Sequence, residues 1–122
     1  MDPRKQLPAY RKFYKTFEAW YVPEEWQSEL ANYFLHGFVP GSFHTALFEN
    51  DLHRAAITSH PANTWQAIIS FMQWLDHYAP KGSWGSRDAV LTWLELDANQ
   101  RREQCEQANI LATAWELLRI TE

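Results

Sequence analysis

The chain has 122 residues, the length of one domain, so we expect a single domain over residues 1–122. Hydrophobic residues make up 46% and charged residues 21%, which excludes a disordered chain, and the net charge of −4 argues against a general nucleic-acid binder. No apolar run reaches the ~20 residues of a membrane span, and the N-terminus lacks the apolar core of a secretory signal. The single cysteine has no internal partner, which favours a reducing compartment, so we expect a cytoplasmic protein. Because the sequence has no membrane-span pattern, we expect no membrane partner.

Charge is distributed unevenly along the chain. Residues 1–21 carry a net charge of +3, residues 22–94 of −4 and residues 95–122 of −3. We therefore predict that a basic N-terminal helix over 8–21 packs near an acidic C-terminal helix over 98–120, or that these two ends form a surface for self-association into a homo-oligomer.

Helical periodicity starts directly after Pro8. Aromatic residues then recur at spacings of three and four, which is the pattern of one helical face: Tyr10, Phe13, Tyr14, Phe17 and Trp20. Pro23 followed by two glutamates predicts the start of a second helix, and Gly37 predicts its end, so this helix is expected over 23–36.

Two short helices and one long helix are predicted next. Ser42 and Asp51 are each expected to cap a short helix, over about 42–49 and about 51–59. An apolar stripe then predicts a long helix over about 62–78, formed by Trp65, Ile68, Ile69, Met72, Leu75 and Tyr78.

The last third of the chain carries two further start signals. Ser86 is expected to cap a helix, and Asp97 with Gln100 resembles a capping box for a final helix that continues to residue 120. The apolar side of this final helix is expected to be buried, with Cys105 as an inert thiol: Cys105, Ala108, Leu111, Trp115 and Leu118.

The fold class follows from these periodicities. No segment alternates apolar and polar residues with a period of two, so the sequence predicts an all-α fold, a compact bundle of five to seven helices. Seven tryptophans help to raise the aromatic share to 16%, and we expect large rings to fill the core. Three of them are predicted to be core residues: Trp26, Trp65 and Trp93.

The standard signatures of enzymes are missing from the sequence. It has no glycine-rich phosphate loop, no zinc-binding His-Glu-x-x-His helix, no cysteine pair and no nucleophile elbow. Four of the five histidines lie within residues 36–60, but their spacings do not place two ligands on one helical face. We therefore expect no catalytic residues, no metal and no cofactor. A small hydrolase built on His44, Asp51 and His53 is the alternative.

Three polar segments at helix boundaries form a candidate binding face. They span residues 40–43, 50–52 and 83–87, where helix starts expose N–H groups that attract anions. Arg87 would add a positive charge, and Trp84 on its turn would expose a ring for stacking or for a partner. The alternative is that these residues only cap helices. The candidate binding residues are Ser42, Asn50, Asp51, Trp84, Ser86 and Arg87.

The same segments carry a family resemblance. In order they are Gly37, Pro40-Gly41-Ser42-Phe43, Asn50-Asp51-Leu52, Ala55, Asn63, Pro80, Trp84-Gly85-Ser86 and Trp93. This pattern resembles a family of small, uncharacterised proteins carried by bacteriophages and prophages, with a family-like region over about 23–97. The resemblance implies a phage context, in which small accessory proteins often neutralise host defences by binding.

The leading functional hypothesis is a non-enzymatic, phage-type binding protein that acts in the host cytoplasm. Its target would be an immune effector protein of the host or a small anionic ligand such as a nucleotide signal. A regulator associated with nucleic acid through the basic helix over 8–21 is the alternative, less favoured because of the acidic net charge.

Overall fold

The computed structural model describes residues 2–121. Within that range it contains one 3-10 turn and eight α-helices, and no β-strand. The all-α prediction is confirmed, whereas five to seven helices is too few. None of the described helices combines the length and apolarity that a bilayer crossing needs. The elements are η1 (Pro3–Gln6), α1 (Pro8–Ala19), α2 (Glu24–His36), α3 (Ser42–Phe48), α4 (Leu52–Thr58), α5 (Trp65–Tyr78), α6 (Arg87–Glu95), α7 (Ala98–Gln107) and α8 (Ala114–Thr121).

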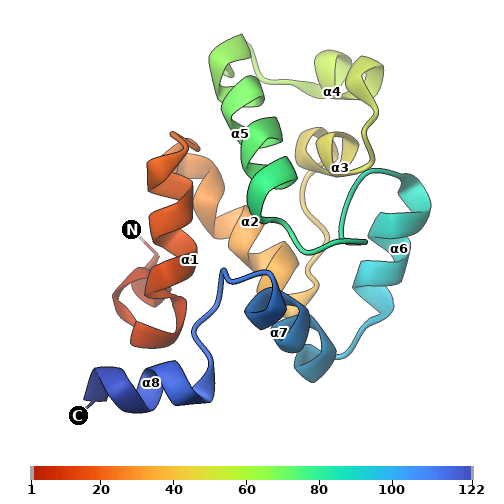
Figure 1. The fold of residues 1–122 in the computed structure, drawn as a ribbon. Helices are drawn as coiled ribbons and strands as arrows, with labels where there is room; N and C mark the ends of the chain where they lie inside the picture. Colours follow the sequence, from red (N-terminus) through yellow and green to blue (C-terminus); the bar gives the residue numbers. More distant parts are fainter. Residues whose placement is uncertain (1, 122) are drawn as a thin grey trace.

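The helices are arranged around α2, which runs through the middle of the molecule (Figure 1). It contacts α1 and α7, while α1 also contacts η1, α5 and α8. The short helices α3 and α4 pack against each other as a corner beside α5.

Local capping explains where several helices begin. The side chains of Asp51 and Ser86 each accept the N–H of the third following residue, at 3.0 and 3.1 Å, so both predicted caps are confirmed. The capping box is also present: Asp97 accepts the Gln100 N–H at 2.8 Å, and the Gln100 side chain accepts the Asp97 N–H at 2.9 Å.

Two predicted helix starts differ from the structure. Ser42 does not cap α3, because Gly41 occupies the N-cap position and its N–H donates to Glu29 Oε1 at 2.6 Å. Ser42 is instead the first helical residue, with an exposed side chain. The long helix begins later than predicted because Thr64 caps it, with a hydroxyl that accepts the Ala67 N–H at 3.1 Å.

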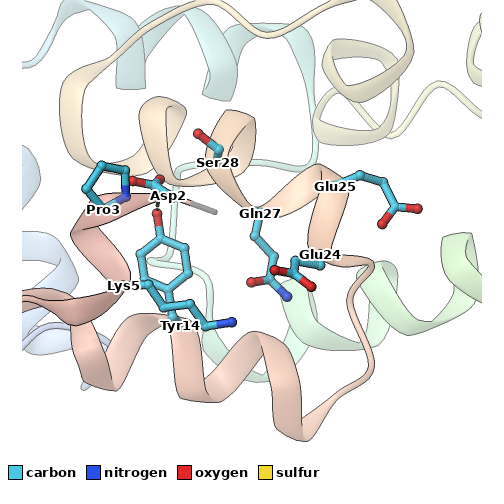
Figure 2. A pocket seen from close by; sticks show the side chains of 8 residues that line it. All are labelled: Asp2, Pro3, Lys5, Tyr14, Glu24, Glu25, Gln27 and Ser28. Carbon is cyan, nitrogen blue, oxygen red and sulfur yellow. Dashed lines mark hydrogen bonds between the residues drawn. The ribbon is translucent and has the colours of Figure 1, made fainter.

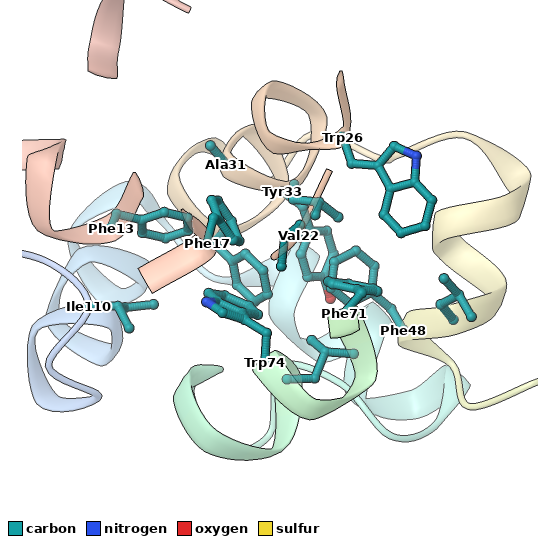
Figure 3. Close-up of a cluster of buried hydrophobic side chains, with 14 of the residues drawn as sticks. Phe13, Phe17, Val22, Trp26, Ala31, Tyr33, Phe48, Phe71, Trp74 and Ile110 are labelled. Atoms are coloured by element: carbon teal, nitrogen blue, oxygen red, sulfur yellow. The ribbon is translucent and has the colours of Figure 1, made fainter. Parts of the chain in front are cut away.

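Aromatic rings fill the core between α1, α2, α3 and α5 (Figure 3). Trp74 is completely buried with its ring centroid 4.6 Å from that of Phe17, and its Nε1 donates to Thr16 Oγ1 at 2.9 Å. Trp93 Nε1 donates to the Tyr33 carbonyl at 3.0 Å. Because an unpaired buried N–H is costly, these two bonds allow both indoles to lie inside the protein.

The expected burial of three tryptophans is only partly correct. Trp26 and Trp93 are 5% and 2% exposed, as predicted, but Trp65 is 61% exposed. The helix α5 is apolar on two adjoining faces, and Trp65 belongs to the outer one, with Ile69 and Met72. The face that turns into the core carries Ile68, Phe71, Trp74 and Leu75.

The helix predicted over 98–120 is divided into two helices. The chain turns at Asn109, which has a φ of 63°, and Ile110 beyond it is completely buried. Cys105 is a buried thiol, as predicted. Trp115 and Leu118 are not on the buried face: they are 69% and 58% exposed, because α8 no longer continues the line of α7.

The two ends of the chain lie together, as their opposite charges suggested. Helix α8 contacts α1, and Lys12 Nζ lies 3.3 Å from Glu116 Oε2. Lys12 also donates to the side chain of Asn109 at the turn before α8. An exposed pair of this kind contributes at most about 1 kcal/mol, so the burial of the α1 aromatics supplies most of the stabilisation.

His44 is a buried polar residue in the aromatic core. Its Nδ1 lies 3.2 Å from Glu29 Oε1, and its ring meets Trp26 edge-on with the centroids 4.8 Å apart. Its Nε2 is buried and makes no hydrogen bond. Burial lowers the pKa of His44 below the usual 6.5, although the nearby Glu29 carboxylate acts in the opposite direction.

Trp93 and Trp65 provide a first test of these assignments. Trp93→Ala should lower the free energy of unfolding by about 3–5 kcal/mol, because it removes a buried ring and its hydrogen bond. Trp65→Ala should change it by less than about 1 kcal/mol, because the ring is mostly in water. Urea unfolding monitored by circular dichroism measures both, and equal losses would show that Trp65 is a core residue after all.

The protonation of His44 provides a second test. The unfolded chain takes up a proton near pH 6.5 that folded His44 resists, so this residue makes stability fall as the pH drops through that range. Between about pH 7.5 and about pH 5.5, His44→Gln should therefore lose less melting temperature than the wild type. His53→Gln, at an exposed position of α4, is the control for the loss of a histidine from the surface. A His44→Gln profile parallel to that of the wild type would contradict the assignment.

Candidate functional site

An apolar groove lies between α5 and the corner formed by α3 and α4. We call it the α5 groove; its volume is about 420 Å³. One wall comes from the outer face of α5 and the other from the corner. The lining residues are Leu47, Asn50, Asp51, Leu52, Trp65, Ile68, Ile69, Met72, Gln73, Asp76 and His77.

The corner has a local cause in the sequence. Asn50 adopts a left-handed conformation with a φ of 61°, which asparagine tolerates better than most residues. Its N–H donates to the Leu47 carbonyl at 3.1 Å, and the Asp51 N–H donates to the Ala46 carbonyl at 2.9 Å. Asp51 then caps α4, so Leu52 projects at the mouth of the groove with 58% of its surface exposed.

The α5 wall is a stripe of large apolar side chains. Trp65, Ile69 and Met72 follow one another at spacings of four and three, so they lie along one side of the helix. Trp65 is mostly exposed, and the other two are half-buried. With Leu52 opposite, the groove presents large apolar side chains to solvent.

The end of the groove near the C-terminus of α5 is polar. Asp76 is exposed in the last turn of the helix, and its carboxylate forms no ion pair or hydrogen bond with any side chain that the structure describes. His77 Nδ1 lies 2.9 Å from the Gln73 carbonyl, and its ring stacks near Trp20 with the centroids 4.3 Å apart. The groove therefore runs from an apolar end to an acidic one.

A second hollow lies on the other side of α3, against α6; we call it the α6 hollow. Its volume is about 580 Å³, and Ser42 and Arg87 lie on its walls. Its other cation, Arg54, has its Nη2 2.8 Å from Glu49 Oε2 and its Nη1 4.0 Å from Asp51 Oδ2. The positive charge of Arg54 is thus compensated within the hollow.

A third hollow lies between η1, α1 and α2 (Figure 2) and has a volume of about 610 Å³. Asp2 accepts hydrogen bonds from Arg4, at 2.6 Å from Nη2, and from the Tyr14 hydroxyl. The Arg4 guanidinium holds the pKa of Asp2 far below its usual range, and burial raises the pKa of Tyr14. Lys5 in turn pairs with Glu18 at 2.7 Å. The remaining charged side chains on its walls are the carboxylates of Glu24 and Glu25, so the hollow offers an anionic ligand no unpaired cation among the described side chains.

The six candidate binding residues are distributed over both sides of α3. Asn50 and Asp51 line the α5 groove, whereas Ser42 and Arg87 line the α6 hollow. The remaining two, Trp84 and Ser86, lie in the turn before α6. That turn is tied to α3, because the Gly85 N–H donates to the Phe48 carbonyl at 2.7 Å. The three segments therefore adjoin, but their side chains face two different hollows.

Trp84 differs from the exposed ring that its turn suggested. Its side chain is half-buried and packs against the core, and Ser86 next to it is occupied as the cap of α6. The sequence interpretation missed Leu52, Trp65 and Met72 as candidate contact residues. The sequence did carry a signal for these residues: the apolar pattern on α5 is broader than a single buried face needs.

Two other kinds of site, a metal site and the catalytic set of a hydrolase, have little support in the described part of the chain. No group of three His, Cys, Asp or Glu residues there is arranged to hold a metal ion. His44 is buried against Glu29 and Asp51 caps α4, while His53 is exposed on α4. Among the described side chains, no hydrogen bond or ion pair joins His44, Asp51 and His53 into a catalytic set. Comparisons with protein-family models, curated proteins and solved structures find no match to this chain.

At the groove corner, the capping hydrogen bond of Asp51 can be tested separately from its negative charge. Asp51→Ala should lower the free energy of unfolding by about 0.5–2 kcal/mol, because it leaves the Arg54 N–H uncapped. Asp51→Asn should retain most of the stability, since an asparagine oxygen caps equally well. Thermal and urea unfolding of the two variants measure this difference. Equal losses would mean that the carboxylate charge, rather than the cap, stabilises the corner.

Proposed function

We propose that this chain is a non-enzymatic, phage-type accessory protein that binds and neutralises a host protein through the α5 groove. The observation that carries the proposal is the exposure of Trp65 beside Leu52 and Met72 in one groove. Contiguous exposed apolar surface is a hallmark of interaction sites, and tryptophan is enriched among residues that dominate binding energy.

A protein partner suits this groove better than a small anionic signal. Its walls are apolar, and the Asp76 carboxylate would repel an anion, while its other carboxylate, on Asp51, lies 4.0 Å from Arg54 Nη1. The α6 hollow has Arg54 and Arg87, but Glu49 compensates the first of these. The anionic-ligand alternative thus depends on Arg87.

The nucleic-acid alternative has weaker support. It needs the basic residues of the N-terminal region to be free for phosphates. Arg4 is bound to Asp2, Lys5 pairs with Glu18, and Lys12 contacts Glu116. Much of the positive charge in residues 1–21 therefore interacts with acidic groups of the chain itself.

The phage context rests on the sequence segments that resemble the phage family. Two of them, at residues 50–52 and 84–86, meet through α3 and the Gly85 hydrogen bond to Phe48. Their adjacency supports the interpretation of the segments as one structural unit, with the groove corner as part of it.

Two tryptophans allow a matched test of the proposal. Trp65 and Trp115 are both helical and are 61% and 69% exposed, but only Trp65 lines the α5 groove. Trp65→Ala should weaken binding to the host target by about thirty-fold or more, the equivalent of ~2 kcal/mol, whereas Trp115→Ala should leave it unchanged. The readouts are phage plating on a defended host that expresses each variant and the Kd for the captured host protein.

The same experiment distinguishes the alternatives. If Arg87→Ala removes activity and Trp65→Ala does not, the α6 hollow and an anionic ligand replace the α5 groove. Mass spectrometry of the denatured protein would then reveal the bound small molecule. Full activity of a folded Trp65→Ala variant would refute the groove as the binding site.

A further inference from the structure

We infer that the α5 groove receives an amphipathic helix of the partner protein that carries a lysine or arginine opposite Asp76. This inference rests on the proposed function, in which the groove binds a protein, and it names the form and charge of the bound segment.

The apolar wall has the dimensions of a helix-binding groove. From Trp65 to Asp76 the helix rises about 17 Å, which is about three helical turns. Along this length, one wall of the groove offers three successive apolar side chains, those of Trp65, Ile69 and Met72. Leu52 belongs to the other wall, at the corner. A partner helix meets such a surface with apolar residues at i, i+3 or i+4, and i+7.

Asp76 is the reason to expect a basic residue on the bound helix. It lies in the last turn of α5, where the negative end of the helix dipole disfavours a carboxylate. Among the side chains that the structure describes, no cation forms an ion pair with it, so no such pair offsets this unfavourable position. A residue that opposes a local rule without compensation is a mark of function, and a cation on the partner would provide the missing charge.

Other occupants fit the acidic end less well. A second copy of this chain would bring its own net charge of −4, and a fatty acid or nucleotide would bring an anionic group to Asp76. A basic amphipathic helix satisfies both the apolar wall and the carboxylate.

The probes are two synthetic helical peptides of about 14 residues with identical leucines at i, i+4 and i+7. One carries lysines on the flank of the leucine face, and the other has glutamate in place of every lysine. Fluorescence anisotropy with the full chain should show binding of the lysine peptide at least about ten-fold tighter than that of the glutamate peptide, with a difference that shrinks in high salt. Trp65→Ala should abolish binding of the lysine peptide, and Trp115→Ala should not.

Two aspartates provide a matched pair of variants. Asp76→Asn should raise the Kd for the lysine peptide by about two- to five-fold, and Asp76→Lys by more than about ten-fold. The melting temperature should stay constant or rise in both, because a charge that opposes the helix dipole is removed. Asp88, exposed in the first turn of α6 and outside the groove, is the control. Asp88→Asn should leave the Kd unchanged, and it should not raise the melting temperature, since its charge favours the dipole.

Three results would overturn the inference. They are equal binding of the two peptides, binding of neither peptide, and a dimer in analytical ultracentrifugation that Trp65→Ala dissociates, which would make a second copy the occupant. The proposed function fails separately: it stands as long as Trp65→Ala, and not Trp115→Ala, removes neutralisation of the host target.

Discussion

The fold depends on the burial of Tyr33 in the last turn of α2. Its ring is completely buried and stacks on Phe48 with the centroids 4.2 Å apart. A hydroxyl in such a place needs an acceptor, and the Tyr33 hydroxyl donates to the Ser83 carbonyl at 2.7 Å. Burial raises the pKa of Tyr33, so the group remains a neutral donor. The Tyr33 carbonyl in turn accepts from Trp93. One residue thus joins α2 to α3, to the turn before α6 and to α6 itself.

The positions of both hollows follow from this connection. The turn held by Tyr33 buries Ser83 and directs the Gly85 N–H to the Phe48 carbonyl at the end of α3. With α3 fixed in this way, the α5 groove opens on one side of it and the α6 hollow on the other. The packing of α5 also explains why Trp65 is exposed. Phe71 and Trp74 pack into the aromatic core, which fixes the rotation of the helix and turns Trp65 outward. The same packing that stabilises the core therefore presents the groove.

A close contact holds α7 against the C-terminal end of α2. Gly37 ends α2 with a φ of 65°, and a Cβ on this residue would lie 2.7 Å from Arg101 Nη1. The buried Arg101 side chain therefore lies against a glycine that is needed for two reasons, its left-handed backbone and its lack of a side chain. Arg101 also donates to the Leu96 carbonyl, which connects α7 to the end of α6. The sequence identified Gly37 as a helix end, but not the arginine that packs over it.

The sequence alone determined the features that depend on near neighbours in the chain. The caps at Asp51, Ser86 and Asp97 involve residues three positions away, so propensity and spacing were enough to predict them, as they were for the helical class. The rotation of α5, by contrast, was decided by tertiary packing. Its apolar residues cover two faces, and only the fit of Phe71 and Trp74 into the core separates the buried face from the groove that contains Trp65. The break at Asn109 was decided in the same way, since the buried residues that follow it leave the helical line to enter the core. Local hydrogen bonds are encoded within a few residues, whereas the choice of which apolar face is covered depends on partners more than thirty positions away, such as Phe34 beside Trp74.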